Sequence, residues 1–376
     1  MLYRITTRLL TLTLALGLLF SAVHSAYAQT PQESPMTNQE FVRLLYQLPK
    51  YPETKDALIE EVRRRGISFP LTDGLRSLVA TKSGNDVLLR RTLEEAERRR
   101  QNPTSFRPPS LAEANEVLEK ARVATLAATE AMPDFIVRQQ IIRSYALGST
   151  ENWQISDRLT IIVTYRVNQG EDYRVLAVNG MPPSKEMKEG RSYEELGGTS
   201  SSGEYVSMLA SLFRPESLTH FQVVDTDILR NRRAIVYEFE VKQMNSRQSL
   251  KSTGNRAVTV GYRGRVWIDR ETFRVLRVED IATDIPPDFP IRAKTSLTDY
   301  DWVTIAERQY LLPIAVDLRM TATVEGRGQL IQARNEIRFR NYQKYGTEVK
   351  IIEDVGDEEP PTPEAPPKPD KPEKKP

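Results

Sequence analysis

The spacing of apolar residues predicts helices in the first part of the chain. Between residues 37 and 101 apolar positions recur at helical spacing, as in Phe41, Leu44 and Leu48. Gly66 stands where a helix C-terminus is expected, because glycine adopts the left-handed backbone that ends many helices. We therefore expect a small all-α module over residues 37–101.

A proline-containing stretch separates this module from the rest of the chain. Residues 101–109 carry three prolines and no periodicity, which is typical of a linker. Ser110 then stands at an N-cap position, and apolar residues at a period of 3.6 predict a long helix that ends before Pro133.

After this helix the period of the apolar residues changes to two, which predicts strands. A helical stretch at 203–213 interrupts them, and its apolar residues lie on more than one side. The predicted strands cover 135–143, 159–167, 173–178, 221–229, 234–241, 258–269, 273–280, 293–303, 308–312 with 314–323, and 330–342.

The stretch GRVWIDRETFRVLRVED at residues 264–280 shows the strand pattern best. Val266 and Ile268 alternate with charged or aromatic residues, and the polar break at Arg270-Glu271 predicts the turn of a β-hairpin. The charged residues along it are expected to form mostly the solvent face of a half-buried sheet.

Both ends of the chain have a distinct composition. Residues 1–28 read as a secretory signal: Arg4 and Arg8 precede an apolar run, and Ala26-Tyr27-Ala28 fits a cleavage site. Residues 357–376 are almost entirely Pro, Glu, Lys and Asp, a composition that predicts a disordered tail. We expect an exported protein, periplasmic or secreted, without a transmembrane segment in its mature chain.

The balance of charge argues against nucleic acid as a partner. The full chain has 53 Lys and Arg against 51 Asp and Glu, and loss of the signal removes two of the arginines. Binding to phosphates needs an excess of basic residues on one face.

The residue types needed for common catalytic and metal sites are scarce. The chain has no cysteine and two histidines, of which His24 belongs to the predicted signal and His220 precedes a strand. The carboxylates Asp284, Asp288, Asp299 and Asp301 flank a proline-rich connection, and their spacing places no two of them at a defined separation. We therefore expect no catalytic residues, no metal and no cofactor.

The serine- and glycine-rich loop at residues 196–204 resembles an anion-binding loop only superficially. It has neither the lysine nor the spacing of a phosphate loop. The pattern indicates the entry to the helix at 203–213, or alternatively a lid beside an opening in the sheet.

The order of these elements, with the VWID…T…VLR hairpin at 258–280, resembles the periplasmic lipoprotein carriers and receptors of the LolA/LolB type. The resemblance covers residues 110–346 and implies an α+β fold, a curved antiparallel half β-barrel packed around helices and here preceded by the all-α module. In that fold an unclosed barrel holds acyl chains, so the resemblance implies binding of a lipid or of a lipoprotein acyl chain without catalysis.

Two functional hypotheses follow from the sequence, and a hydrolase is a distant third. The first is a periplasmic binding protein for an acyl chain. The second is an envelope scaffold that binds a protein partner through the helical module and the tail; a completely filled core would favour it. The residues expected to line an apolar cavity are Leu209, Leu212, Phe213, Val266 and Ile268.

Overall fold

A computed structural model describes residues 34–103, 109–148, 150–167, 169–183, 196, 198–200, 207–252, 256–324 and 328–346. The predicted signal at 1–28 and the predicted tail at 357–376 lie outside these residues. The chain divides into two compact units between Gln101 and Asn102, and each is described by itself.

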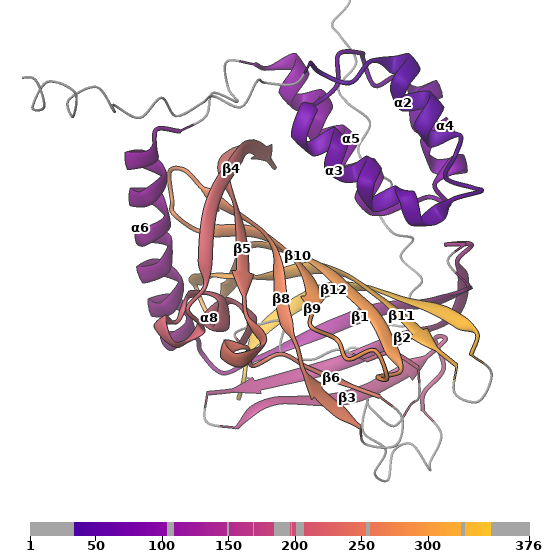
Figure 1. The fold of residues 1–376 in the computed structure, drawn as a ribbon. Helices are drawn as coiled ribbons and strands as arrows, with labels where there is room; N and C mark the ends of the chain where they lie inside the picture. Colours follow the sequence, from indigo (N-terminus) through magenta and orange to yellow (C-terminus); the bar gives the residue numbers. More distant parts are fainter. Residues whose placement is uncertain are drawn as a thin grey trace, which may run out of the picture. The chain divides into compact units, whose positions relative to one another are not determined.

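The first unit is helical (Figure 1). It contains α2 (Asn38–Leu45), the 3-10 helix η1 (Pro52–Thr54), α3 (Lys55–Arg65), α4 (Asp73–Lys82) and α5 (Val87–Gln101). Thr37 and Thr72 cap α2 and α4 with their hydroxyl groups, and Gly66 follows α3 with φ +70°. The apolar positions of these helices meet in a core of their own, which includes Phe41, Leu45, Ile59, Val62, Leu89 and Leu93.

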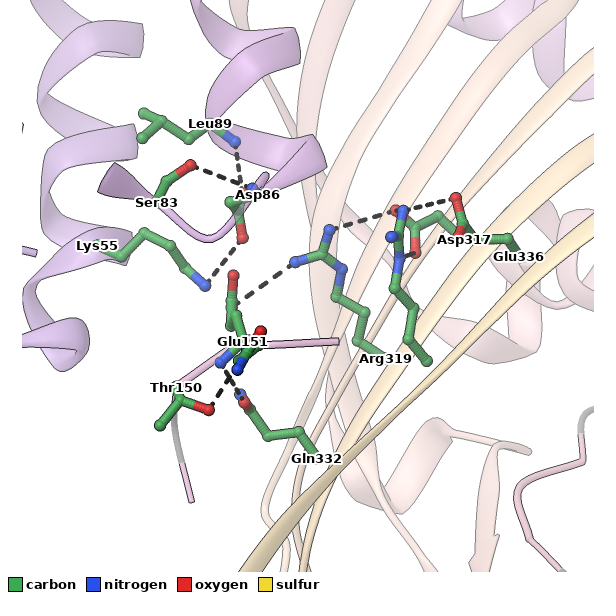
Figure 2. Close-up of polar contacts among 12 residues, drawn as sticks. Lys55, Ser83, Asp86, Leu89, Thr150, Glu151, Asp317, Arg319, Gln332 and Glu336 are labelled. Carbon is green, nitrogen blue, oxygen red and sulfur yellow. Dashed lines mark hydrogen bonds and ion pairs between the residues drawn. The ribbon is translucent and has the colours of Figure 1, made fainter. Parts of the chain in front are cut away.

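A buried carboxylate fixes the turn before α5. The Asp86 side chain is fully buried; its Oδ1 accepts a hydrogen bond of 2.7 Å from the Leu89 amide. Its Oδ2 lies 2.9 Å from Lys55 Nζ, and its amide donates to the Ser83 hydroxyl (Figure 2). The cap thus connects α3 to the start of α5.

The second unit begins with α6 (Leu111–Glu130) and forms one large curved sheet (Figure 1). Its ten strands follow the order β3-β2-β1-β12-β11-β10-β9-β8-β5-β4, and each neighbouring pair in this order is antiparallel. Their bounds are β1 (Phe135–Leu147), β2 (Gln154–Arg166), β3 (Gly170–Val178), β4 (His220–Leu229), β5 (Arg232–Val241), β8 (Gly261–Asp269), β9 (Val275–Thr283), β10 (Ile291–Ile305), β11 (Arg308–Thr323) and β12 (Leu330–Lys344).

β1 and β12, the first and last strands of this sheet in the sequence, pair with each other as the third and fourth strands from the β3 edge. β3 and β4 are the two edges, so the sheet is not closed into a barrel. Smaller elements complete the unit: α8 (Ser207–Phe213), the 3-10 helices η3 (Pro215–Ser217) and η4 (Gln243–Asn245), and the strand pair β6 (Ser249–Lys251) with β7 (Ala257–Thr259). The predicted α+β class, with an unclosed antiparallel sheet and a helical module before it, is confirmed. Within the described residues, no helix combines the length and the apolar character needed to cross a membrane.

Several predicted strand boundaries are wrong: β1 continues to Leu147 instead of residue 143, β2 begins at Gln154 instead of residue 159, and two further cases have a clear cause. β11 runs through Pro313, where the sequence predicts a break, because the register with β10 shifts there: Asp299 pairs with Ala315 and Tyr300 with Pro313. Such an irregularity accommodates a residue without an amide hydrogen. The strand predicted at 258–269 is divided at Val260, because β7 pairs with β6 while β8 pairs with β5 and β9.

The hairpin of β8 and β9 is confirmed, but its charged residues are not a solvent face. Arg277 and Glu279 are more than nine-tenths buried, and Asp280 is completely buried. Charged residues can be buried in this sheet because they are paired across strands, as in the bidentate pair of Arg277 with Asp299 at 2.7 and 3.2 Å. Asp317 on β11 is likewise paired across strands, with Arg334 of β12 at 3.0 Å. Arg319 of the same strand lies 3.5 Å from Asp317 and 3.7 Å from Glu151 (Figure 2).

Candidate ligand-binding face of the sheet

One face of the large sheet is apolar from edge to edge. We call it the inner face; it carries Val266 and contacts α6 and α8. The pairing register places one residue of each strand in a single row across this face, and nine of the ten are apolar or aromatic. The row consists of Val178, Leu159, Ile141, Ile337, Val316, Thr298, Val278, Val266, Tyr237 and Val223.

The row joins two apolar clusters. The helix-covered cluster lies between α6, α8 and strands β5, β8 and β9, and it includes Ala121, Leu212, Tyr237 and Val266. The second cluster lies over β1, β2, β11 and β12 and includes Ile141, Leu159, Val316 and Ile337. Thr298, which is 1% exposed, stands between them. The inner face therefore offers an apolar surface that crosses all ten strands.

All five residues predicted to line a cavity lie in the helix-covered cluster. Leu209, Leu212 and Phe213 come from α8, and Val266 and Ile268 come from β8. Each is at most 6% exposed, so the five residues that the sequence assigned to one site do lie buried together. In this structure all five are buried in that cluster, and a lining role for them stays a prediction.

Polar contacts attach α6 to the sheet at both of its ends. Near its N-terminus, Arg270 makes a bidentate pair with Glu113 at 2.6 and 2.8 Å, and the Tyr237 hydroxyl donates to the Ala114 carbonyl at 2.7 Å. Near its C-terminus, Arg274 donates to the Ala124 carbonyl at 2.6 Å. These contacts fix α6 over the inner face.

Two pKa values follow from this arrangement. The hydrogen bond from Arg270 holds the pKa of the Glu113 carboxyl below its usual range. Burial raises the pKa of the Tyr237 hydroxyl, and the negative charge of Glu113 raises it further. The tyrosine therefore stays protonated and continues to donate to α6 over the whole physiological range.

The helix α8 contacts the sheet differently from α6. Leu209, Leu212 and Phe213 pack into the helix-covered cluster, and the Phe213 ring stacks on Phe221 with centroids 5.6 Å apart. Among the described residues, the hydrogen bonds of α8 outside its own turns lead to the segment that follows it, such as that from the Thr219 hydroxyl to the Leu212 carbonyl at 2.7 Å. Apolar contact thus holds α8 in the helix-covered cluster, where it packs against α6 as well as against β4.

The described part of the loop before α8 also contacts the inner face. Leu196 packs against the second cluster, and the Thr199 carbonyl accepts a hydrogen bond of 2.8 Å from Asn335 Nδ2. At Gly198, with φ +74°, an added Cβ would come within 3.0 Å of the Arg143 guanidinium. The positive φ explains the glycine, because other residues adopt it only with strain. The entry to the helix and the lid both stay predictions for this loop; residues 197 and 201–204 lie outside the described part.

A polar group on the inner face was not predicted as a site. Asp280 is fully buried there and accepts hydrogen bonds from Lys294 Nζ and from the Ser296 hydroxyl. The alternation of the strand contained the signal, because Asp280 is two residues from Val278 and must share its face. The pairing of Asp280 with Ser296 and with Gly264 confirms this placement.

The remaining candidates of the sequence form no common site. His220 is exposed at the start of β4. Asp299 pairs with Arg277, Asp288 lies 3.1 Å from Arg256, and Asp301 lies 3.5 Å from Arg230. Arg230 also lies 3.5 Å from Asp299, so Asp299 and Asp301 are brought together around this arginine, while Asp288 pairs elsewhere. The described residues contain no group of three metal-ligating side chains.

Comparison with known proteins gives likenesses in structure. No family model and no curated protein matches the chain. Among solved structures it is similar to a domain named for outer membrane lipoprotein sorting from Vibrio parahaemolyticus, at 16% identity and a TM-score of 0.27, over 63% of this chain and 95% of that one.

A protein of the DUF1329 family from Desulfovibrio piger is similar at 12% identity and a TM-score of 0.25, over 62% and 93% of the two chains. A LolA superfamily protein from Nitrosomonas europaea is similar at 12% identity and a TM-score of 0.21, over 58% and 93%. The resemblance to the LolA type is thus also found among solved structures. At these TM-scores it carries no residue role and no function to this chain.

Proposed function

We propose that the second unit is a non-enzymatic binding protein for an acyl chain of a lipid or lipoprotein in the cell envelope. The acyl chain lies on the inner face of the sheet, in the place where α8 packs in the ligand-free protein. Leu209, Leu212 and Phe213 then form a movable wall, and Val266 and Ile268 form the fixed one. The chain is exported to the periplasm by its signal sequence.

The observation that supports this proposal most is the apolar row across all ten strands. An acyl chain is recognised by apolar contact and needs no catalytic group. The proposal is also supported by the different ways in which the two covering helices, α6 and α8, are attached. α6 is attached by hydrogen bonds and an ion pair, whereas α8 contacts the strands through apolar side chains, which an acyl chain can replace contact for contact.

The test is a titration of the mature chain (residues 29–376) with a fluorescent probe that carries a long acyl chain. We expect saturable binding of one probe per chain. Leu209→Ala removes contacts of α8 without changing the strands, so α8 is displaced more easily and the affinity rises about tenfold. The matched control is Leu111→Ala, because Leu111 is 71% exposed at the start of α6.

The long acyl chain of the probe distinguishes movement of α8 from simple filling of the cavity that Leu209→Ala leaves. A cavity left by one leucine is too small for a long acyl chain, so increased binding by Leu209→Ala requires that α8 moves. An absence of saturable binding to the wild-type chain and to this variant refutes the proposal.

A second candidate function is an envelope interaction protein that binds a partner through the helical unit. The complete burial of the five predicted lining residues favours it, because a filled core needs no ligand. The helical unit also carries two exposed aromatic rings, Tyr46 at 55% and Tyr51 at 43%. Lys82 and Lys50 lie over these rings at 4.4 and 5.1 Å from the ring centroids. Failure of the probe titration would leave this candidate as the better account.

A further inference from the structure

Asp280 and Lys294 form a polar group on the inner face, although a purely apolar ligand would need no polar partner there. Asp280 is fully buried, and the side chain of Lys294 is 13% exposed. A buried ion pair contributes little net stability, because both charges lose their hydration, and apolar side chains of similar size often serve as well. The pair of Arg277 with Asp299 lies on the opposite face of the sheet, whereas the pair of Asp280 with Lys294 lies beside the apolar row.

The pair adjoins the helix-covered cluster directly. On β8 the residue that pairs with Asp280 is Gly264, which stands between Tyr262 and Val266 on the inner face. The glycine has no side chain, so the carboxylate borders on these two members of the cluster. Burial raises the pKa of the Tyr262 hydroxyl, and the negative charge of Asp280 raises it further, in agreement with this proximity.

We infer that Asp280, Lys294 and Ser296 form a head-group site for a zwitterionic amphiphile whose acyl chain lies on the apolar row. This inference rests on the proposed function and adds the class of ligand to it. The ammonium group of the head pairs with Asp280, and its phosphate pairs with Lys294 and the Ser296 hydroxyl. Both protein charges exchange one partner for another, so neither is left buried without a counter-charge.

A head group that carries charge of only one sign cannot provide a new partner for both Asp280 and Lys294. An anionic head draws Lys294 away from Asp280 and leaves a fully buried carboxylate without its counter-charge, which is strongly unfavourable. An uncharged head leaves the pair undisturbed but gains no ionic contact. For the same acyl chain we therefore expect zwitterionic head groups to bind best, uncharged ones next and anionic ones least.

The test uses lysophosphatidylethanolamine, monoacylglycerol and lysophosphatidylglycerol with the same acyl chain. Each displaces the fluorescent acyl probe from the mature chain at a concentration below its own aggregation. We expect the zwitterionic lipid to bind at least about tenfold more tightly than the anionic one, because the anionic head leaves a buried charge unpaired. Equal affinities for all three refute the head-group site and leave the acyl-binding proposal intact, whereas binding of none refutes the acyl-binding proposal.

Two variants separate recognition from folding. Asp280→Asn leaves Lys294 without its carboxylate, so the preference is expected to reverse in favour of the anionic lipid. The double variant Asp280→Asn with Lys294→Met removes both charges, keeps similar volumes and is expected to fold and to bind all three lipids within about twofold.

The matched control is Glu116→Gln, which changes a carboxylate that lies 2.6 Å from Lys120 on the exposed side of α6. This variant is expected to keep the wild-type preference. A double variant that still prefers the zwitterionic lipid would overturn the inference.

Discussion

Substitution of Leu212 by alanine tests the packing of α8 on the sheet. The Leu212 side chain is 1% exposed and lies in the helix-covered cluster. The change removes the equivalent of three methylene groups, which corresponds to about 2.4 kcal/mol of transfer free energy at about 0.8 kcal/mol each. The cavity that remains raises the expected loss in the free energy of unfolding to about 3–5 kcal/mol.

The assay is urea-induced unfolding followed by tryptophan fluorescence. The chain has three tryptophans, Trp153, Trp267 and Trp302, and all lie in the second unit, so the signal reports on the sheet and not on the helical module. The control Leu111→Ala makes the same chemical change at an exposed position and is expected to change the free energy of unfolding by less than about 0.5 kcal/mol. A loss below about 1 kcal/mol for Leu212→Ala would contradict the packing of α8 described above.

Three further predictions concern the attachment of α6 and the inner face. Tyr237→Phe removes the hydrogen bond to α6 and should lower the free energy of unfolding by about 1 kcal/mol in the same assay, while the exposed Tyr345→Phe should not. Because the pKa of Glu113 is lowered from 4.5, its ion pair stabilises the fold above pH 4.5 and loses this effect as the pH falls through the lowered pKa; Glu113→Gln should therefore lose less stability than the wild type between pH 6 and pH 3. Gly264→Ala places a Cβ 1.8 Å from the Glu279 carbonyl oxygen and should cost about 3 kcal/mol, whereas Gly74→Ala meets no atom within 4 Å and should leave thermal unfolding by circular dichroism unchanged or slightly raised.

Periodicity in the sequence predicted the elements because each helix or strand carries its own pattern. The alternation of Val266 and Ile268 with charged or aromatic neighbours is a local property, and the face they share follows from it directly. The same alternation assigns Asp280 to the inner face, but its burial could not be predicted, because charged residues in strands usually face solvent.

The contacts that define the candidate site join distant parts of the chain. Arg270 and Glu113 are 157 positions apart, and no local pattern indicates that they pair. The pairing of β1 with β12 is likewise a property of the whole sheet, and it places Ile141 beside Ile337. The apolar row could therefore be recognised only after the strand order was known, although each of its residues lies in a predicted strand.

The measurement that tests the central claim most directly is native mass spectrometry of the mature chain purified from envelope fractions, followed by extraction and analysis of lipids. We predict a bound acyl-chain species in a one-to-one ratio, and its loss when the long-chain probe is added in excess. A ligand-free mass, together with no saturable response to the probe by the wild-type chain or by Leu209→Ala, would contradict an acyl-binding role for the inner face.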